Sequence, residues 1–84
     1  MGYEKVYVAM YLYVDADGKV KPAVLEWKDG KRYKIDRVLD ERISPPLHTG
    51  GVLTKRFCVS IMGREKVIYL EKHSNRWFVE KPLY

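Results

Sequence analysis

The chain has 84 residues, one cysteine and a formal net charge of +5. That length fits a single domain spanning residues 1–84, and a domain this short buries only about 60–65 % of its unfolded surface, so its margin of stability is thin. One cysteine excludes an intramolecular disulfide, and His48, Cys58 and His73 lack the spacing of a zinc site. A hydrophobic content of 46 % with 32 % charged residues is typical of a folded domain rather than a disordered tail.

The N-terminal segment lacks the features of a targeting signal. The apolar stretch 6–14 is too short to cross a bilayer, and neither a basic region before it nor a cleavage site after it is present. A myristoylation signal needs Ser or Thr where Val6 stands. We therefore expect a cytoplasmic protein that does not associate with a membrane.

The positive charge is concentrated in the second half of the chain. Residues 1–42 carry nine basic and eight acidic residues, whereas residues 43–84 carry seven basic and three acidic residues. An excess of this size suits an anionic partner, but it is also common on soluble domains that bind none. The charge distribution alone therefore favours basic residues scattered over the surface rather than a binding site for an anion.

Alternating apolar residues and frequent Gly, Pro and Asp turns predict an all-β fold, since no window carries a sustained helical pattern. The first strand runs from about Tyr3 to Val14, with an aliphatic face at even positions and a tyrosine-rich face at odd positions. Successive side chains of a strand point to opposite sides, so both faces require cover. The segment 15–18 then turns the chain.

The second strand covers about 20–27, and Pro22 places its start at an edge or a bulge. Two registers are open for the next hairpin. A two-residue Asp-Gly turn pairs Leu25 with Lys34, whereas a three-residue loop with Gly30 in the left-handed conformation pairs Leu25 with Tyr33 and Glu26 with Arg32. We prefer the second, because it matches apolar side chains and opposite charges.

The segment 27–40 is dense in charge but nearly self-cancelling, with five basic and three acidic residues. This balance favours a solvated outer face over a phosphate-binding cradle. The apolar alternation also changes phase between Tyr33 and Val38. A bulge or sharp bend near Asp36 restores a continuous core, and a small closed barrel requires such bends.

Three strands follow the irregular segment 44–52. We expect a two-residue hairpin in which Gly63 is the first loop residue, which pairs Cys58 with Tyr69 and Arg56 with Glu71. A four-residue loop over 72–75 then sets Tyr69 beside Phe78, Leu70 beside Trp77 and Ile68 beside Val79. The predicted inner face comprises Phe57, Val59, Ile61, Ile68, Leu70, Trp77 and Val79.

The predicted outer face of these three strands is also apolar, with Cys58, Val67, Tyr69 and Phe78 adjacent and Met62 close by. Such a patch is either covered by another element or used for binding. The elements together predict a small, bent, five- to six-stranded SH3-like barrel. Its thin core and excess apolar surface favour a homodimer.

A pattern of turns and aromatic residues resembles a family of short uncharacterised bacterial proteins. The pattern comprises Trp27, Asp29-Gly30, Tyr33, Ile35-Asp36, Val38-Leu39, Gly50-Gly51, Met62-Gly63-Arg64-Glu65 and Arg76-Trp77-Phe78-Val79-Glu80. The resemblance spans most of residues 24–80. It implies a small SH3-like β-barrel and, because some members are encoded beside error-prone DNA polymerases, an accessory role near DNA. It supplies no catalytic residues.

The sequence does not favour catalysis, a metal or a cofactor. Cys58 falls in a predicted strand, where a small hydrophobic role is more common than a reactive thiolate. His48 and His73 fall in loops with no predicted geometry relative to Cys58, which a nucleophile and base require. Asp15 and Asp17 precede Gly18 without a distal Glu, which is a turn rather than a calcium loop.

Two binding functions compete, each against the plainer interpretation of structural or scattered residues. A non-catalytic nucleic-acid module, or a partner of a nucleic-acid-processing protein, would use basic residues near an aromatic ring. Its candidate residues are Lys55, Arg64, Lys66, Lys72, Arg76 and Tyr69. A protein–protein adapter would hold a peptide or a second copy on an aromatic surface. Its candidate residues are Tyr7, Tyr11, Tyr13 and Phe78.

Overall fold

A computed structural model describes residues 3–44 and 53–82, which form seven β-strands and no helix. Their hydrogen-bonded order is β3-β2-β1-β7-β6-β5-β4, and every pair is antiparallel. The strands are β1 (Tyr3–Val14), β2 (Val20–Glu26), β3 (Arg32–Lys34), β4 (Arg37–Ser44), β5 (Thr54–Ile61), β6 (Arg64–Glu71) and β7 (Arg76–Pro82). The all-β prediction is confirmed, but the number of strands is seven rather than five or six.

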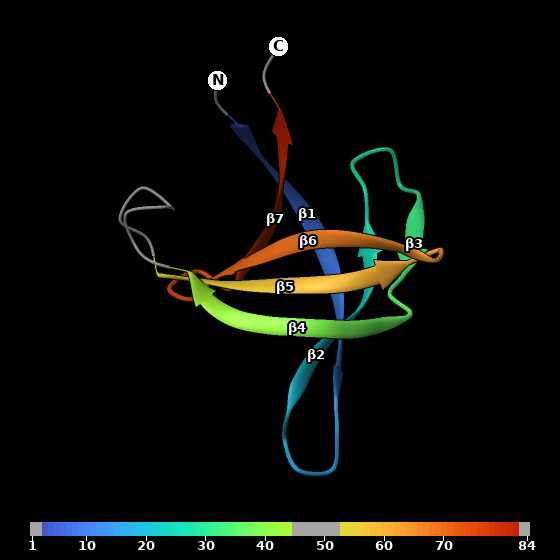
Figure 1. The fold of residues 1–84 in the computed structure, drawn as a ribbon, viewed down its shortest axis with the longest axis vertical. Coiled ribbons are helices and arrows are strands. Elements are labelled where there is room, and N and C mark those ends of the chain that lie inside the picture. Colours follow the sequence, from blue (N-terminus) through green and yellow to red (C-terminus); the bar gives the residue numbers. More distant parts are fainter. Residues whose placement is uncertain (1–2, 45–52, 83–84) are drawn as a thin grey trace.

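The sheet curls into an open half-barrel because β1 belongs to two ladders. Its first half, Tyr3 to Val8, pairs with β7, and its second half, from Ala9 onward, pairs with β2. In Figure 1, β4, β5 and β6 lie side by side and cross the direction of β1 and β2. Of the segment 44–52, which the sequence predicts to be irregular, the structure describes only Ser44. His48 and Gly50-Gly51 lie outside the described residues.

A sharp bend at Ile35 and Asp36 joins the two edges of this sheet. The amide of Ile35 donates to the carbonyl of Ala23 in β2 (2.9 Å), and the next amide, that of Asp36, donates to the carbonyl of Ser60 in β5 (2.7 Å). Edge strands β3 and β4 are therefore successive pieces of one bent segment. The predicted bend near Asp36 is confirmed.

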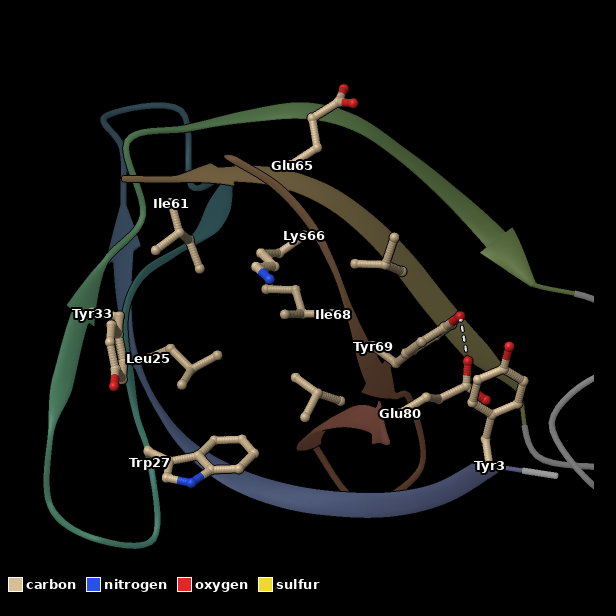
Figure 2. Close-up of a pocket in the computed structure, with 12 residues that line it drawn as sticks. Tyr3, Leu25, Trp27, Tyr33, Ile61, Glu65, Lys66, Ile68, Tyr69 and Glu80 are labelled. Atoms are coloured by element: carbon tan, nitrogen blue, oxygen red, sulfur yellow. Dashed lines mark hydrogen bonds between the residues drawn. The ribbon is translucent and has the colours of Figure 1, made fainter. Parts of the chain in front are cut away.

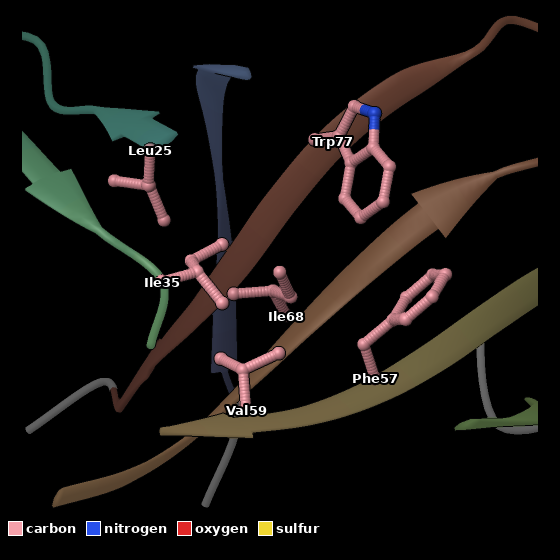
Figure 3. Packing of buried hydrophobic residues seen from close by; sticks show 6 residues of the cluster. All are labelled: Leu25, Ile35, Phe57, Val59, Ile68 and Trp77. Carbon is pink, nitrogen blue, oxygen red and sulfur yellow. The ribbon is translucent and has the colours of Figure 1, made fainter. Parts of the chain in front are cut away.

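The core fills the inside of the curl. Its buried residues come from β2, the bend, β5, β6 and β7, and Figure 3 shows them converging. They are Leu25, Ile35, Phe57, Val59, Ile68 and Trp77. Phe57 and Trp77 lie with ring centroids 5.1 Å apart. Ile61, Leu70 and Val79 pack against this cluster while half-buried, so the predicted inner face is confirmed.

The first two hairpins follow the predicted turn chemistry. Gly30 has φ of 87° in a three-residue loop that pairs Leu25 with Tyr33 and Glu26 with Arg32, which confirms the preferred register. In the earlier turn, the Asp15 carboxylate accepts hydrogen bonds from the amides of Asp17 and Lys19. The β1–β2 register shifts where Leu12 pairs with Pro22, a bulge that the proline predicted.

The predicted β5–β6 register is wrong. Met62 and Gly63, with φ of 53° and 76°, are the two loop residues, which gives the mirror-image turn favoured in two-residue hairpins. Cys58 consequently pairs with Val67, and Arg56 with Tyr69 rather than Glu71. The expected partners are displaced by two residues. A shift of two preserves which side chains face inward, so the core prediction survives the error.

The β6–β7 hairpin has the predicted four-residue loop but a shorter ladder than expected. Tyr69 pairs with Phe78, Leu70 with Trp77 and Glu71 with Arg76, and there the pairing ends. The expected pairing of Ile68 with Val79 is absent from the ladder, and Val79 pairs only with Val6 of β1. The two strands diverge beyond this point (Figure 1).

Replacing Gly30 by Val should lower the free energy of unfolding by about 1 kcal/mol or more, because β-branched residues resist a positive φ. A Cβ at this position meets no atom within 4 Å, so the loss isolates backbone strain. Gly30→Asn is the control, since Asn tolerates the left-handed conformation and should lose less. Chemical denaturation measures both; an unchanged midpoint for Gly30→Val contradicts the loop conformation.

Met62→Asn should raise the free energy of unfolding by about 0.5–1 kcal/mol, because Asn-Gly suits a turn with two positive φ values. The Met62 side chain is 78 % exposed, so its removal costs little packing. Met62→Ala is the matched control, since it removes the same side chain without relieving the backbone. Thermal melts of the two variants should differ in favour of Asn; equal midpoints would argue against strain at this turn.

Candidate functional site

The predicted nucleic-acid residues do not converge on one groove. Lys55 and Lys72 line a pocket at one end of the half-barrel, whereas Lys66 lines a different pocket at the other end. Arg64 follows the β5–β6 turn. The guanidinium of Arg76 lies 3.5 Å over the Tyr7 ring on the outer face. The hypothesis of one groove in the last three strands therefore needs revision.

Lys55 and Lys72 instead meet lysines from the first half of the chain. Lys19 and Lys21 lie before and within β2, and all four lysines line one pocket of about 380 Å³, which we name the lysine pocket. Its lining also includes Phe57, Leu70 and Trp77 of the core and the acidic residues Asp40 and Glu41. The β1–β2 loop, strands β2 and β5 and the β6–β7 loop thus assemble a basic cluster that no single segment contains.

Pairing inside the lysine pocket leaves a positive balance. The ammonium of Lys55 lies 3.5 Å from a Glu41 carboxylate oxygen, so this pair is neutralised. Asp40 accepts hydrogen bonds from the guanidinium of Arg42, outside the pocket lining, with a shortest distance of 2.6 Å. Among the described residues, the exposed ammonium groups of Lys19, Lys21 and Lys72 have no ion-pair partner. Three unpaired positive charges therefore surround one hollow.

A second hollow of about 520 Å³ adjoins the lysine pocket and shares Lys21 and Val38 with it. Lys34, Arg37 and the 58 % exposed Tyr13 also line it, together with one carboxylate, that of Asp36. We name the basic track by its members from both hollows. They are Lys19, Lys21, Lys34, Arg37, Lys55, Lys72 and Tyr13. Lys34 and Arg37 belong to the segment that the sequence favoured as a plain solvated face.

The aromatic surface predicted on the outer face is partly occupied within the chain. Phe78 is 1 % exposed, so the prediction that it contacts a partner is wrong. The Tyr69 ring stacks on it at 5.0 Å, and the Tyr7 ring meets it edge-on at 5.9 Å. Neighbouring Tyr11 donates to Glu26 and packs against the Arg32 guanidinium, 5.0 Å from its ring centroid. Phe78 is therefore covered within the chain, whereas the rings of Tyr7, Tyr11 and Tyr13 stay exposed.

Tyr69 is poorly placed as a stacking platform for a base, because Phe78 occupies one face of its ring. Its hydroxyl donates to Glu80 at 2.8 Å. Burial, together with this hydrogen bond, raises the pKa of Tyr69. Tyr13 of the basic track is the exposed ring beside unpaired lysine and arginine side chains.

A buried carboxylate anchors this outer cluster. Glu71 is 4 % exposed and accepts hydrogen bonds from the Tyr7 hydroxyl (2.8 Å), the Lys5 ammonium (3.1 Å) and the Ser74 hydroxyl (3.0 Å). Burial raises the pKa of Glu71, but these three donors outweigh it and hold the pKa below its ordinary value of 4.5. The predicted Arg56–Glu71 pair is replaced by this network, which ties β1 to the end of β6.

A further hollow lies where β6 and β7 diverge. It has a volume of about 660 Å³, and we name it the aromatic pocket. In Figure 2, Trp27 and Tyr33 face Ile68 across it, and Tyr3 lies near Tyr69 and Glu80 at its rim. No local sequence pattern predicts this pocket, because it results from the early end of the β6–β7 ladder.

The described residues offer little for catalysis or metal binding. Cys58 is half-buried in β5, and His73 is exposed in the β6–β7 loop, while His48 lies outside the described residues. Within residues 3–44 and 53–82, no group of three His, Cys, Asp or Glu side chains is placed to hold a metal ion. The same ranges contain no helix long and apolar enough to cross a membrane.

Comparison with known proteins finds no matching family model, curated protein or solved structure. The resemblance to the family of short bacterial proteins therefore stays a prediction. The basic track and the aromatic pocket must be interpreted from their own chemistry.

Sequence reasoning missed Lys19 and Lys21 as site residues. Both follow the Asp15–Gly18 turn in a half of the chain that is nearly neutral, so net charge gave no reason to select them. A periodicity signal existed, since Lys19 and Lys21 alternate along one strand face. Their meeting with Lys72 depends on the curl of the sheet, which no local pattern encodes.

Replacing Glu71 by Gln should lower the free energy of unfolding at neutral pH by about 1–3 kcal/mol, because buried donors lose a charged acceptor. Since folding lowers the pKa of Glu71, its ionisation stabilises the protein fully above pH 4.5, and this contribution is lost as the pH falls through the lower folded-state pKa. Denaturation of wild type and Glu71→Gln should thus converge in acid.

Glu65→Gln is the control for the Glu71 measurement, because Glu65 is exposed and its removal changes the net charge equally. This variant should track the wild type at every pH. A Glu71→Gln deficit that stays constant from neutral pH to well below 4.5 would contradict the assigned pKa direction.

Proposed function

We propose that this chain is a non-catalytic module that binds single-stranded nucleic acid along the basic track. The observation that carries the proposal is the convergence of Lys19, Lys21 and Lys72, all unpaired among the described residues, around one hollow. Like charges gathered without partners repel each other, so an anion that bridges them is favoured. Phosphates spaced along a strand supply such anions repeatedly.

The shape of the track supports a strand rather than an isolated phosphate. Lys34 and Arg37 extend the positive charge into the adjoining hollow, where Tyr13 presents an exposed ring. Small β-barrels bind single strands by combining a basic groove with rings on which bases stack. Phe57 and Trp77 are 2 % and 6 % exposed, so they form the floor of the lysine pocket and leave stacking to Tyr13.

The fold and the setting of the protein are part of the same proposal. The sharp bend at Asp36 and the curled antiparallel sheet support an SH3-like barrel in which the ladder between β6 and β7 is incomplete. The family resemblance supports an accessory role near DNA, and the single cysteine suits a reducing compartment such as the cytoplasm. The second candidate function, a protein–protein adapter, is supported by the aromatic pocket.

Neutralising Lys21 and Lys72 together, each to Gln, should weaken binding to a labelled oligonucleotide of about 15 nucleotides and reduce the salt slope by about 1.4, since each lost phosphate contact removes about 0.7. Arg64→Gln with Lys81→Gln is the matched control, because it removes the same two charges away from the track. The control pair should leave the slope nearly unchanged. Fluorescence anisotropy over a series of salt concentrations measures both.

Tyr13→Ala separates stacking from charge in the same assay. It should reduce binding by about 1–3 kcal/mol at constant slope if a base stacks on the ring. Equal slopes for the track and control pairs would indicate scattered charge and overturn the assigned track. No binding of single- or double-stranded oligonucleotides at low salt would remove the nucleic-acid function altogether.

A further inference from the structure

The split between β6 and β7 exposes backbone as well as side chains. The two strands share only three residue pairs, although each continues beyond them. Past Phe78, β7 pairs with β1, and before Tyr69, β6 pairs with β5. Within the described ranges, no strand pairs with residues 64–68 of β6 on the side that faces the split.

The register fixes which backbone groups point into this split. In a two-residue hairpin the flanking residues, here Ile61 and Arg64, exchange both hydrogen bonds, and hydrogen-bonded pairs then alternate along the ladder. Lys66 and Ile68 consequently bond to β5. The amides and carbonyls of Glu65 and Val67 point away from β5, toward the split. They form a short free edge on which another extended chain can pair.

The aromatic pocket adjoins this free edge. Trp27 and Tyr33 line the side formed by β2 and β3, and Ile68 lines the side formed by β6, so a side chain entering from the edge meets apolar surface (Figure 2). Alternate side chains of an extended peptide project to the same side. A peptide paired with Glu65 and Val67 would therefore direct one apolar side chain inward.

A charged group gives the pocket a preferred ligand chemistry. Figure 2 shows the Lys66 side chain turned toward Ile68 within the pocket lining. Among the described residues, its ammonium has no ion-pair partner, whereas Glu80 at the rim already accepts a hydrogen bond from Tyr69. Glu65 also lines the pocket, but Figure 2 shows its carboxylate turned away from Ile68. An unpaired cation beside apolar surface favours a carboxylate near the apolar side chain of the ligand.

We propose that the β6–β7 split binds an extended segment of a partner protein by strand addition to β6. The backbone of the segment pairs with Glu65 and Val67, an apolar side chain occupies the aromatic pocket between Trp27 and Tyr33, and an acidic residue meets Lys66. Backbone pairing supplies affinity and the pocket supplies specificity, as in other β-strand addition complexes. This site is separate from the basic track, so neither proposal depends on the other.

A library of random peptides about ten residues long is the probe, selected against the full chain. Selection should enrich an apolar residue with a nearby Asp or Glu. Val67→Pro removes the amide aimed at the split without removing a ladder hydrogen bond to β5, because Pro is tolerated where the amide is unpaired. Its matched control is Val67→Thr, which keeps both the amide and the β-branched shape.

Val67→Pro should lower the affinity for the selected peptide about tenfold, because a carbonyl of the peptide loses its hydrogen-bond donor. Val67→Thr should bind the peptide as the wild type does. N-methylation of alternate peptide amides gives the same test from the ligand side if Val67→Pro fails to fold. Lys66→Glu should weaken the binding of acidic peptides and leave oligonucleotide binding along the basic track intact. The double variant Lys21→Gln with Lys72→Gln should weaken oligonucleotide binding and leave peptide binding intact.

Three outcomes would overturn the proposal. The first is a selection that enriches no peptide, and the second is a set of peptides insensitive to Val67→Pro and to every backbone N-methylation. The third is a homodimer in sedimentation that Val67→Pro dissolves, since the split would then belong to a second copy of this chain. Loss of peptide binding together with loss of oligonucleotide binding in one variant would indicate unfolding, which a thermal melt of that variant decides.

Discussion

Two consecutive amides, those of Ile35 and Asp36, hold this fold in its curled form. One donates to β2 and the next to β5, so the chain leaves one edge of the sheet and immediately becomes the other edge. Because neighbouring residues of a strand direct their amides to opposite sides, the bend is compatible with ordinary extended backbone. The side chain of Ile35 is buried in the core, so the bend that curls the sheet also contributes a core residue. Flattening the sheet would break both hydrogen bonds and expose this side chain.

The curl also explains why the half-barrel is hollow at both ends. Strand β7 pairs with β6 only from Arg76 to Phe78 and with β1 from Trp77 to Pro82, so the two ladders overlap over two residues and β6 loses this neighbour beyond them. The Glu71 network ties β1 to the end of β6, the first three residues of β7 pair with β6, and the rest of β7 pairs with β1 alone. The aromatic pocket opens where β6 and β7 separate, toward the Ile61 end of β5. The lysine pocket lies toward the Lys55 end of the same strand.

Local patterns in the sequence were sufficient for the strands, their faces and the Gly30 hairpin. Side-chain pairing decided that register, since only one alternative matched Leu25 with Tyr33 and Glu26 with Arg32. The next hairpin failed because a positive φ at Met62 has no signal in residue type, and glycine alone suggested the wrong loop position. The core prediction was insensitive to that error, since a shift of two keeps each side chain on its face. The predicted pairing of Arg56 with Glu71 depended on the exact register, and Arg56 pairs with Tyr69 instead.

The candidate site was predictable only in part, because binding surfaces depend on which separate segments meet. Lys55 and Lys72 were selected for their local charge, yet Lys19 and Lys21 complete their pocket from a nearly neutral half of the chain. Conversely, Phe78 looked like a surface residue from the strand pattern, and Tyr7 and Lys5 of β1 and the ring of Tyr69 cover it.

The buried core cluster lies between the basic track and the aromatic pocket, with Val59 and Ile68 fully buried. Substitutions at distant sites with no shared partners act nearly independently. Occupation of one proposed site should therefore leave the affinity of the other almost unchanged. An adapter that joins a nucleic-acid strand to a protein segment requires that independence, because each ligand must remain bound while the other exchanges.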